Sequence, residues 1–166
     1  IPHIEQLLGI EDGGFFSAED VMARRARLGK HVLILDEGGN WKGCGTALKM
    51  AEEGHQVVLI TPDPLVGKEL QRTAADYPLR QKLAQLGVRF ILESAITRWT
   101  PQGAEILSFL DGSTSFVEAD SLVFATPNLA EDTLARELEN SGLKFLNIGD
   151  SAGPRQAPFV ISEARR

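Results

Sequence analysis

Two short apolar runs with a helix-like segment between them form the most regular pattern in the chain. Residues 32–35 and 57–60 are apolar at every position, which is typical of strands covered on both faces of a parallel sheet. Between them, a glycine-rich stretch leads into residues 46–53, where apolar side chains recur at helical spacing, and Gly54 follows as a helix stop. The region 31–61 therefore predicts one β-α-β unit.

The segment before this unit predicts a linker and one helix. Residues 1–16 contain glycines and show no sustained period, so they are interpreted as a linker. Ser17, with Asp20 three positions later, is close to a capping box and predicts a helix over 18–28.

The pattern after the unit changes from helical to alternating. Residues 95–100, 104–110 and 113–117 alternate with a period of two, which predicts an antiparallel meander with Asp111-Gly112 as a hairpin turn. Residues 121–125 return to an apolar run suited to the centre of a sheet. The other predicted elements are helical pieces over 66–74 and 78–86, a strand over 88–92, a helix over 129–141, a strand over 145–148 and a helix over 158–166.

Composition and charge exclude several classes of partner. The 166 residues carry a net charge of -6, and the one basic run is short, at 24–27, so nucleic acid and anionic membranes are poor candidates. No apolar run reaches the roughly 18 to 20 residues that a membrane span needs, and no signal pattern opens the sequence. A cytoplasmic location is expected.

Few residues are available for metal or disulfide chemistry. Cys44 is the single cysteine, which rules out an internal disulfide and a cysteine-ligated metal or iron-sulfur cluster within this chain. The histidines, His3, His31 and His55, are scattered along the sequence. No metal site and no catalytic residue are therefore predicted.

Three sequence strings resemble one family of redox enzymes. Residues 32–43, VLILDEGGNWKG, followed by 54–62, GHQVVLITP, look like the C-terminal half of the trimethylamine dehydrogenase and 2,4-dienoyl-CoA reductase family. Residues 147–155, NIGDSAGPR, are similar to its Gly-Asp-x-x-x-Pro-Arg segment, and 122–127, LVFATP, stand in place of its Ala-Thr-Gly strand end. The resemblance covers nearly the whole chain.

The resemblance implies an α/β fold, a Rossmann-like three-layer domain with a central parallel sheet and an antiparallel three-stranded β-meander. This is the fold of the NAD(P)H domain of glutathione-reductase-like flavoproteins. The implied division is a linker and entry helix at 1–30, an NAD(P)H-domain-like module at 31–128, and a return segment of an FAD-like domain at 129–166.

The resemblance also implies missing domains. The chain starts at Ile1 and stops within a helix-like segment, so we expect a piece of a longer polypeptide. Members of the family join an old yellow enzyme-type barrel, with FMN and a 4Fe-4S cluster, to a pair of dinucleotide-type domains. The expected partners are thus the flavin barrel and the FAD-like domain of the parent, with FAD as a further parent cofactor.

The glycine-rich turn departs from a working phosphate loop. Such a loop needs Gly-x-Gly-x-x-Gly at the strand end, and the spacing here is about two residues too long. Asp36 and Glu37 stand close to where phosphate oxygens would lie, and a carboxylate about 4 Å from a phosphate costs roughly 1 kcal/mol in water and about 4 kcal/mol at an effective dielectric of 20. Lys42 could offset one such charge. Thr61 replaces the acid expected to hold a ribose.

Seven residues are candidates for binding NAD(P)H or ADP, should the turn bind either. Trp41 could stack on an adenine or a flavin, or cover the loop or a neighbouring domain. Cys44 is interpreted as a small residue in a tight turn. For Asp150, which the resemblance places near the sugar-like chain of an FAD or an equivalent ADP site, a capping role is equally open. The seven candidates are Gly38, Gly39, Gly43, Gly45, Thr61, Thr126 and Asp150.

Two functional hypotheses remain. In the first, the chain is a non-catalytic nucleotide-domain-like module of a flavin- and iron-sulfur-dependent oxidoreductase that acts on an amine, an N-methylated compound, an enoyl or an enone. In the second, it binds NAD(P)H or ADP independently, for electron delivery or regulation. Under the resemblance, Trp41, Phe145 and the apolar face of 158–164 should be partly exposed, because the corresponding segments pack on other domains.

Overall fold

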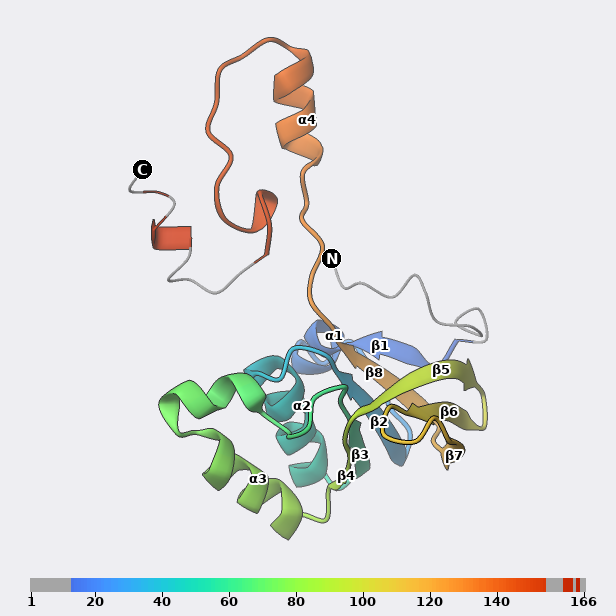
Figure 1. Ribbon diagram of the computed structural model, residues 1–166. Helices are drawn as coiled ribbons and strands as arrows, with labels where there is room; N and C mark the ends of the chain where they lie inside the picture. The colour runs from blue at the N-terminus through green and yellow to red at the C-terminus, as the bar shows by residue number, and fades with distance from the viewer. Residues whose placement is uncertain (1–12, 155–159, 163, 165–166) are drawn as a thin grey trace. The chain divides into compact units, whose positions relative to one another are not determined.

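The computed structural model describes residues 13–154, 160–162 and 164. Within them the chain forms two compact units, which divide after Thr126. The first unit holds a parallel sheet with the strand order β1-β8-β2-β3-β4 (Figure 1). Its strands are β1 (Phe15–Ser17), β2 (His31–Asp36), β3 (Gln56–Ile60), β4 (Arg89–Ile91) and β8 (Ser121–Ala125).

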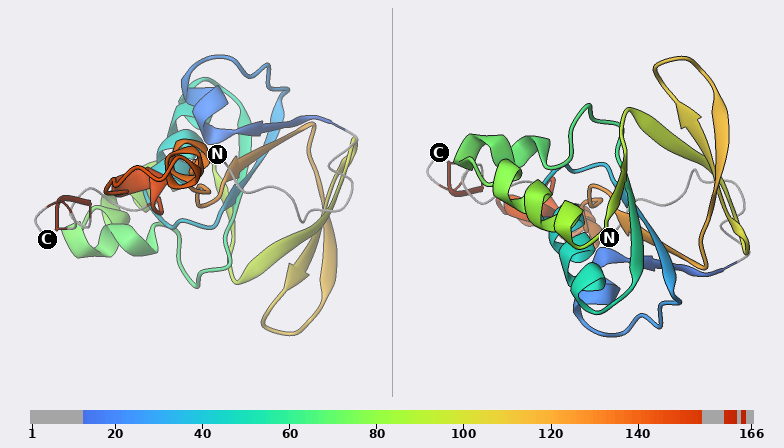
Figure 2. Two further views of the ribbon diagram at one scale, coloured as in Figure 1. Left: turned by 90° about the horizontal axis from the view of Figure 1, so that it is seen from above. Right: turned by 90° about the horizontal axis from the view of Figure 1, so that it is seen from below.

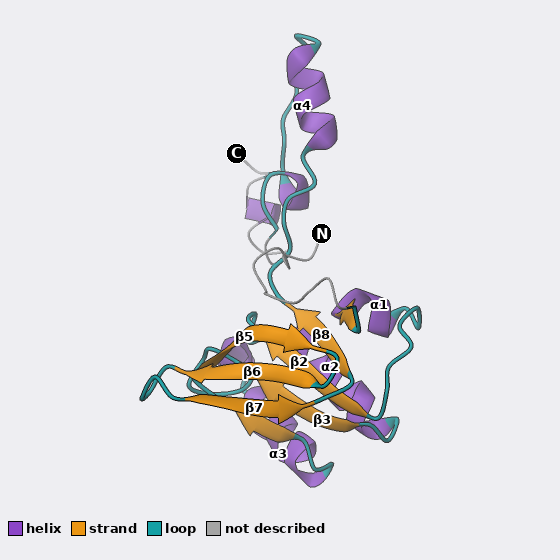
Figure 3. Cartoon of the chain, turned by 90° about the vertical axis from the view of Figure 1, so that its right-hand side faces the viewer, coloured by secondary structure: helices purple, strands orange, loops and turns teal. Residues whose placement is uncertain are grey.

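Helices cover one face of this sheet and a second sheet covers the other (Figures 2 and 3). Side chains of β2 alternate between the two cores, with Val32 and Ile34 on the helical side and Leu33 and Leu35 on the other. The predicted three-layer α/β fold is therefore confirmed. The covering elements are α1 (Ala18–Met22), α2 (Trp41–Glu52) and α3 (Asp76–Gln85), opposed by β5 (Ser94–Thr100), β6 (Gly103–Ser108) and β7 (Thr114–Glu118).

Strand β1 lies in the segment predicted to be a linker. Phe15 pairs with Leu122 in the register of β8, and its ring meets that of Phe124 edge to face, with the centroids 6.2 Å apart. A strand of three residues is too short for a period of two to be visible in the sequence. The sheet therefore begins well before residue 31.

Helix α1 begins as predicted and ends early. Ser17 and Asp20 form the capping box, with each side chain bonded to the backbone of the other. The helix stops at Met22 rather than at 28, because Arg24 adopts a positive φ of 57°. Arg24 thus holds the left-handed position just past a helix end, where glycine is the usual residue.

Replacing Arg24 with glycine should stabilise the chain by about 1 kcal/mol, because glycine adopts a left-handed backbone without the steric cost that a Cβ brings. Urea-induced unfolding measures the change. Arg25→Gly is the matched control, since Arg25 has no positive φ and pairs with Asp20 at 3.0 Å. Equal losses of stability in the two variants would contradict the assignment of strain to Arg24.

Helix α2 begins at Trp41, five residues before the predicted start at 46. The side chain of Asn40 caps it by accepting a hydrogen bond from the Lys42 amide at 2.8 Å. Gly43 and Gly45 therefore lie inside the helix, and the prediction that both belong to the turn is wrong. The connection between β2 and α2 is residues 37–40 alone, called the β2–α2 turn below, so the long loop is also not found.

The second unit contains fewer regular elements than predicted. Helix α4 runs from Thr133 to Asn140, inside the predicted 129–141. The strand predicted over 145–148 is absent, because the described residues of this unit include no strand that could pair with it. A 3-10 helix, η3 (Gly149–Ser151), follows, and residues 160–162 are helical. Residues 158–159, 163 and 165–166 of the predicted last helix lie outside the described residues.

The remaining elements agree with the predicted pattern. The helical piece over 66–74 is a 3-10 helix, η2 (Lys68–Thr73), and the meander has the predicted three strands. The expected exposure is confirmed for Trp41, Phe145 and Ile161, with exposed fractions of 57%, 38% and 54%.

Candidate functional site

A buried carboxylate occupies the inside of the β2–α2 turn. Asp36, the last residue of β2, has no solvent exposure, and its Oδ1 accepts hydrogen bonds from the amides of Gly38 and Gly39 at 3.1 and 3.0 Å. In a phosphate loop, amides at this place in the fold point at a phosphate. Here the Asp36 side chain accepts the hydrogen bonds of these amides.

Burial raises the pKa of Asp36 to about 6, against the lowering effect of its bonds with Gly39, Gly38 and Cys44. Asp63 raises it further through its negative charge. The Cys44 thiol lies 3.7 Å from Oδ2, and burial together with Asp36 raises the pKa of Cys44 well above its ordinary value. Cys44 is therefore a protonated, unreactive thiol in the first turn of α2.

Gly43 lets α2 approach this carboxylate closely. A Cβ at Gly43 would lie 2.2 Å from Cγ of Asp36, so the position accepts only glycine while Asp36 is in place. Close helix–strand packing is also the role of the third glycine in a dinucleotide fingerprint. Gly45 differs, since a Cβ there would meet no atom within 4 Å.

The structure brings together three of the seven candidate residues, Gly38, Gly39 and Gly43, around Asp36. Thr61 lies beyond β3 with no solvent exposure, and its hydroxyl accepts a hydrogen bond from the Asp63 amide at 3.2 Å.

The remaining candidates have other surroundings. Thr126 is buried at the end of β8, Gly45 lies on α2, and Asp150 is exposed within η3 of the second unit. In the described structure, the Thr61 and Thr126 side chains are therefore closed off from solvent.

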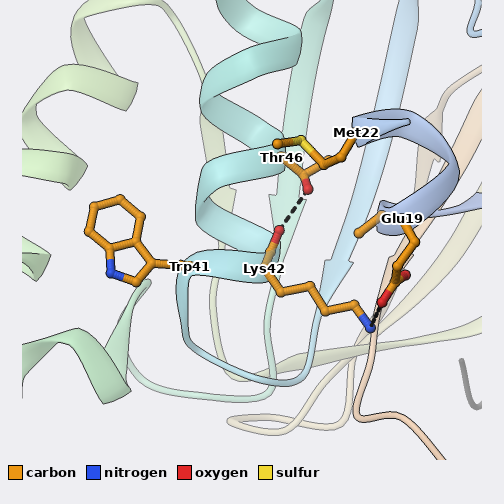
Figure 4. Close-up of a pocket in the computed structure, with 6 residues that line it drawn as sticks. Glu19, Met22, Trp41, Lys42 and Thr46 are labelled. Carbon is orange, nitrogen blue, oxygen red and sulfur yellow. Dashed lines mark hydrogen bonds and ion pairs between the residues drawn. The ribbon is translucent and has the colours of Figure 1, made fainter. Parts of the chain in front are cut away.

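Lys42 does not offset the charge of Asp36. Its ammonium group donates to the backbone carbonyl of Thr126 at 2.9 Å and pairs with Glu19 of α1 at 2.8 Å. Figure 4 shows the Lys42 side chain turned toward Glu19, beside a pocket of about 310 Å³ that Met22 and Thr46 also line. The Trp41 ring points away from Lys42 on the other side of the helix (Figure 4).

Sequence reasoning placed Asp36 near the turn and missed its role there. An aspartate followed by two glycines at the second and third positions is a pattern for a side chain that caps the turn amides after it, and this signal was available. Among the described residues, no group of three or more histidine, cysteine or acidic side chains could hold a metal. In the same part of the chain, no helix is long and apolar enough to cross a membrane.

Comparisons with known proteins identify relatives of this chain. No family model matches the chain. Cinnamate reductase from Clostridium sporogenes is 32% identical over 153 residues, which is 90% of this chain and 22% of the relative. Dimethylamine dehydrogenase from a Hyphomicrobium species is 23% identical over 172 residues, which is 88% of this chain and 23% of the relative. The chain is a relative of the trimethylamine dehydrogenase and 2,4-dienoyl-CoA reductase family.

Solved structures show the same fold. The 6-hydroxypseudooxynicotine amine oxidase of Pseudomonas geniculata N1 matches with a TM-score of 0.86 at 24% identity, over 93% of this chain and 24% of the oxidase. The HOCl-induced flavoprotein disulfide reductase of Escherichia coli matches with a TM-score of 0.70 at 18% identity, over 99% of this chain and 41% of the reductase. The chain thus spans between 21% and 28% of the length of these curated relatives.

Proposed function

We propose that the chain is a non-catalytic, nucleotide-domain-like module of a flavin- and iron-sulfur-dependent oxidoreductase. The class is that of the amine and N-methyl dehydrogenases or of the enoyl and enone reductases. Two relatives, named for dimethylamine dehydrogenation and cinnamate reduction, support this class. The small share of each relative that the chain spans supports a parent with further domains, a flavin barrel with FMN and a 4Fe-4S cluster among them.

The domain assignment is part of the proposal. We place the NAD(P)H-domain-like module over 31–128, and β1 and α1 of the preceding segment add to its sheet and its helical layer. We assign 129–166 to a return segment of an FAD-like domain of the parent. The exposure of Leu146, with 76% of its surface open to solvent in a segment whose sequence favours a strand, supports a surface that another domain covers.

The observation that carries the proposal is the position of the Asp36 carboxylate. A diphosphate in the β2–α2 turn needs the amides of Gly38 and Gly39, and both already donate to Asp36. An ionised Asp36 about 4 Å from a phosphate oxygen would also cost about 4 kcal/mol at an effective dielectric of 20. The turn is therefore satisfied without a ligand, and its role in this proposal is to join β2 to α2.

An amide-resolved titration tests the proposal. The ¹⁵N-labelled chain is titrated with NADH, NADPH and ADP to millimolar concentration while the amide resonances of Gly38, Gly39 and Gly43 are followed. We expect no saturable shift at these three amides, because Asp36 holds the turn. Saturable shifts there would establish the alternative, an independent NAD(P)H- or ADP-binding module, and would overturn the proposal.

Asp36→Gly supplies the matched comparison for this titration. The substitution removes the carboxylate that accepts the two amides and leaves the rest of the turn unchanged. If Asp36 is what closes the turn, nucleotide should shift the Gly38 and Gly39 amides of this variant more than those of the wild type. Equal responses would show that Asp36 does not exclude the ligand.

A further inference from the structure

A second pocket, of about 540 Å³, lies near the amino ends of β2 and β3. Arg24 and Arg27 reach it from the connection between α1 and β2, Lys49 from the last turn of α2, and His55 from the residue before β3. The β2–α2 turn lies at the carboxyl ends of the same strands, so this pocket is separate from the nucleotide position of the fold. It is called the basic pocket below.

Positive charge dominates the basic pocket. In the described part of the chain, neither Arg24 nor Arg27 forms an ion pair, whereas the neighbouring Arg25 pairs with Asp20. Lys49 pairs with Glu53, which is the acidic residue of the pocket. Arg27 thus has no paired carboxylate among the described residues, whereas Arg24 lies close enough to Glu53 to lower its pKa, in a chain whose net charge is -6.

Lys49 and Arg24 lie near Glu53 in the basic pocket. The hydrogen bond from Lys49 lowers the pKa of Glu53, and the positive charges of Lys49 and Arg24 lower it further. Nδ1 of His55 lies 2.7 Å from the carbonyl oxygen of Gly29, which can only accept, so Nδ1 carries a proton. The ring is thereby held in one orientation within the pocket wall.

The backbone of Arg24 adds an independent observation. Its positive φ is a conformation that glycine adopts freely and that is strained for a residue with a side chain. An arginine at a left-handed position of this kind points to a role for its side chain. The guanidinium group of this side chain carries positive charge at the basic pocket.

We propose that the basic pocket binds the phosphate groups of a small phosphorylated molecule, a nucleoside phosphate in class. The guanidinium forks of Arg24 and Arg27 match phosphate oxygens, and Val21 and Met50 supply an apolar floor for the organic part. The volume lies within the range of small-molecule sites. A concave site of this size favours a small ligand over an acidic protein segment.

The test titrates the ¹⁵N-labelled full chain with pyrophosphate, ADP and adenosine. We expect pyrophosphate and ADP to shift the amides of Arg27, Lys49 and His55, with ADP binding more tightly because its organic part contacts the floor. Adenosine alone should cause no saturable shift. The absence of shifts at these amides with both phosphates would overturn the proposal, and so would tighter binding of a glutamate-rich peptide than of ADP.

Three variants test whether the arginines of the basic pocket contribute to ADP binding. Arg27→Ala and Arg24→Gly should each weaken ADP binding about tenfold, since a hydrogen bond between charged groups has roughly that effect on affinity. Arg98→Ala, which removes one exposed positive charge from β5 and lines neither pocket, should leave affinity unchanged. Equal weakening in all three variants would overturn the site and leave only an effect of net charge.

Arg24→Gly also separates binding from folding. The variant should melt at a higher temperature than the wild type while it binds ADP more weakly. Weaker binding together with a lower melting temperature would attribute the change to misfolding and overturn the role given to the side chain. Because shifts are read at Arg27, Lys49 and His55 here, and at Gly38 and Gly39 for the β2–α2 turn, failure of one proposal is distinguishable from failure of the other.

Discussion

Replacing Gly43 with alanine should destabilise the chain by about 3 kcal/mol, the upper part of the range for overpacked cores. The new Cβ would lie 2.2 Å from Cγ of Asp36 and 2.5 and 2.6 Å from its two carboxylate oxygens. Asp36 cannot move away easily, because β2 fixes its backbone and two turn amides hold its side chain. Helix α2 would have to shift outward from the sheet. Urea-induced unfolding at pH 7 measures the loss.

Gly45→Ala is the matched control for this variant. It lies on the same helix two residues later, and its Cβ would meet no atom within 4 Å. Alanine there should stabilise the helix by up to about 1 kcal/mol. Adding Asp36→Gly to Gly43→Ala should recover part of the loss, because it removes the atoms that clash, and a double-mutant cycle reports the coupling. Additive effects of the two substitutions would show that the contact does not limit the position.

Replacing Asp36 with asparagine should change how stability depends on pH. The folded pKa of Asp36, about 6, lies above its ordinary value of 3.8, so the folded state binds the proton more tightly. The tighter proton binding therefore stabilises the folded wild type in full below pH 4. This stabilisation is lost as pH rises through 6, which lowers the free energy of unfolding by about 3 kcal/mol. Asparagine keeps the shape and one acceptor for the amides, and it does not titrate.

The measurement is the free energy of unfolding of both proteins at several values between pH 4 and pH 7. We expect the free energy of unfolding of the variant to rise relative to that of the wild type from pH 4 to pH 7. Most of this relative rise should be complete near pH 7. The comparison removes the contributions of all other titrating groups, which both proteins share. Parallel profiles would mean that Asp36 ionises in the folded state as freely as in the unfolded state.

Hydrophobic period was sufficient to predict the meander and four strands of the parallel sheet, which are β2, β3, β4 and β8. Strands β2, β3 and β8 are apolar at every position other than their ends, and these apolar residues are buried except for the half-buried Val58. Strands β5, β6 and β7 cover the sheet with one face, which carries Ile96, Trp99, Ala104, Ile106 and Val117. The start of α2 was missed because Gly43 and Gly45 lower helix propensity. The Asn40 cap and the packing of Cys44 and Ala47 in the core override that preference.

Other features depend on contacts that no local pattern contains. The strand predicted at 145–148 has the right residues and no partner strand in its unit among those described, and β1 exists because β8 pairs with it. The inward direction of Asp36 depends on the approach of α2 at Gly43. The basic pocket joins residues from three separate segments, of which only the 24–27 run stood out in the sequence.

The carboxylate that fills the β2–α2 turn has a consequence for how the fold responds to metabolite supply. A nucleotide domain whose turn amides are satisfied by a cofactor gains stability from that cofactor, about 2.7 kcal/mol at a concentration one hundred times the dissociation constant, and loses it when the cofactor is depleted. Asp36 is covalently part of the chain, so its carboxylate is present at the turn amides at any nucleotide concentration. Under the proposed function, nucleotide concentration therefore does not change the stability of the fold through this turn.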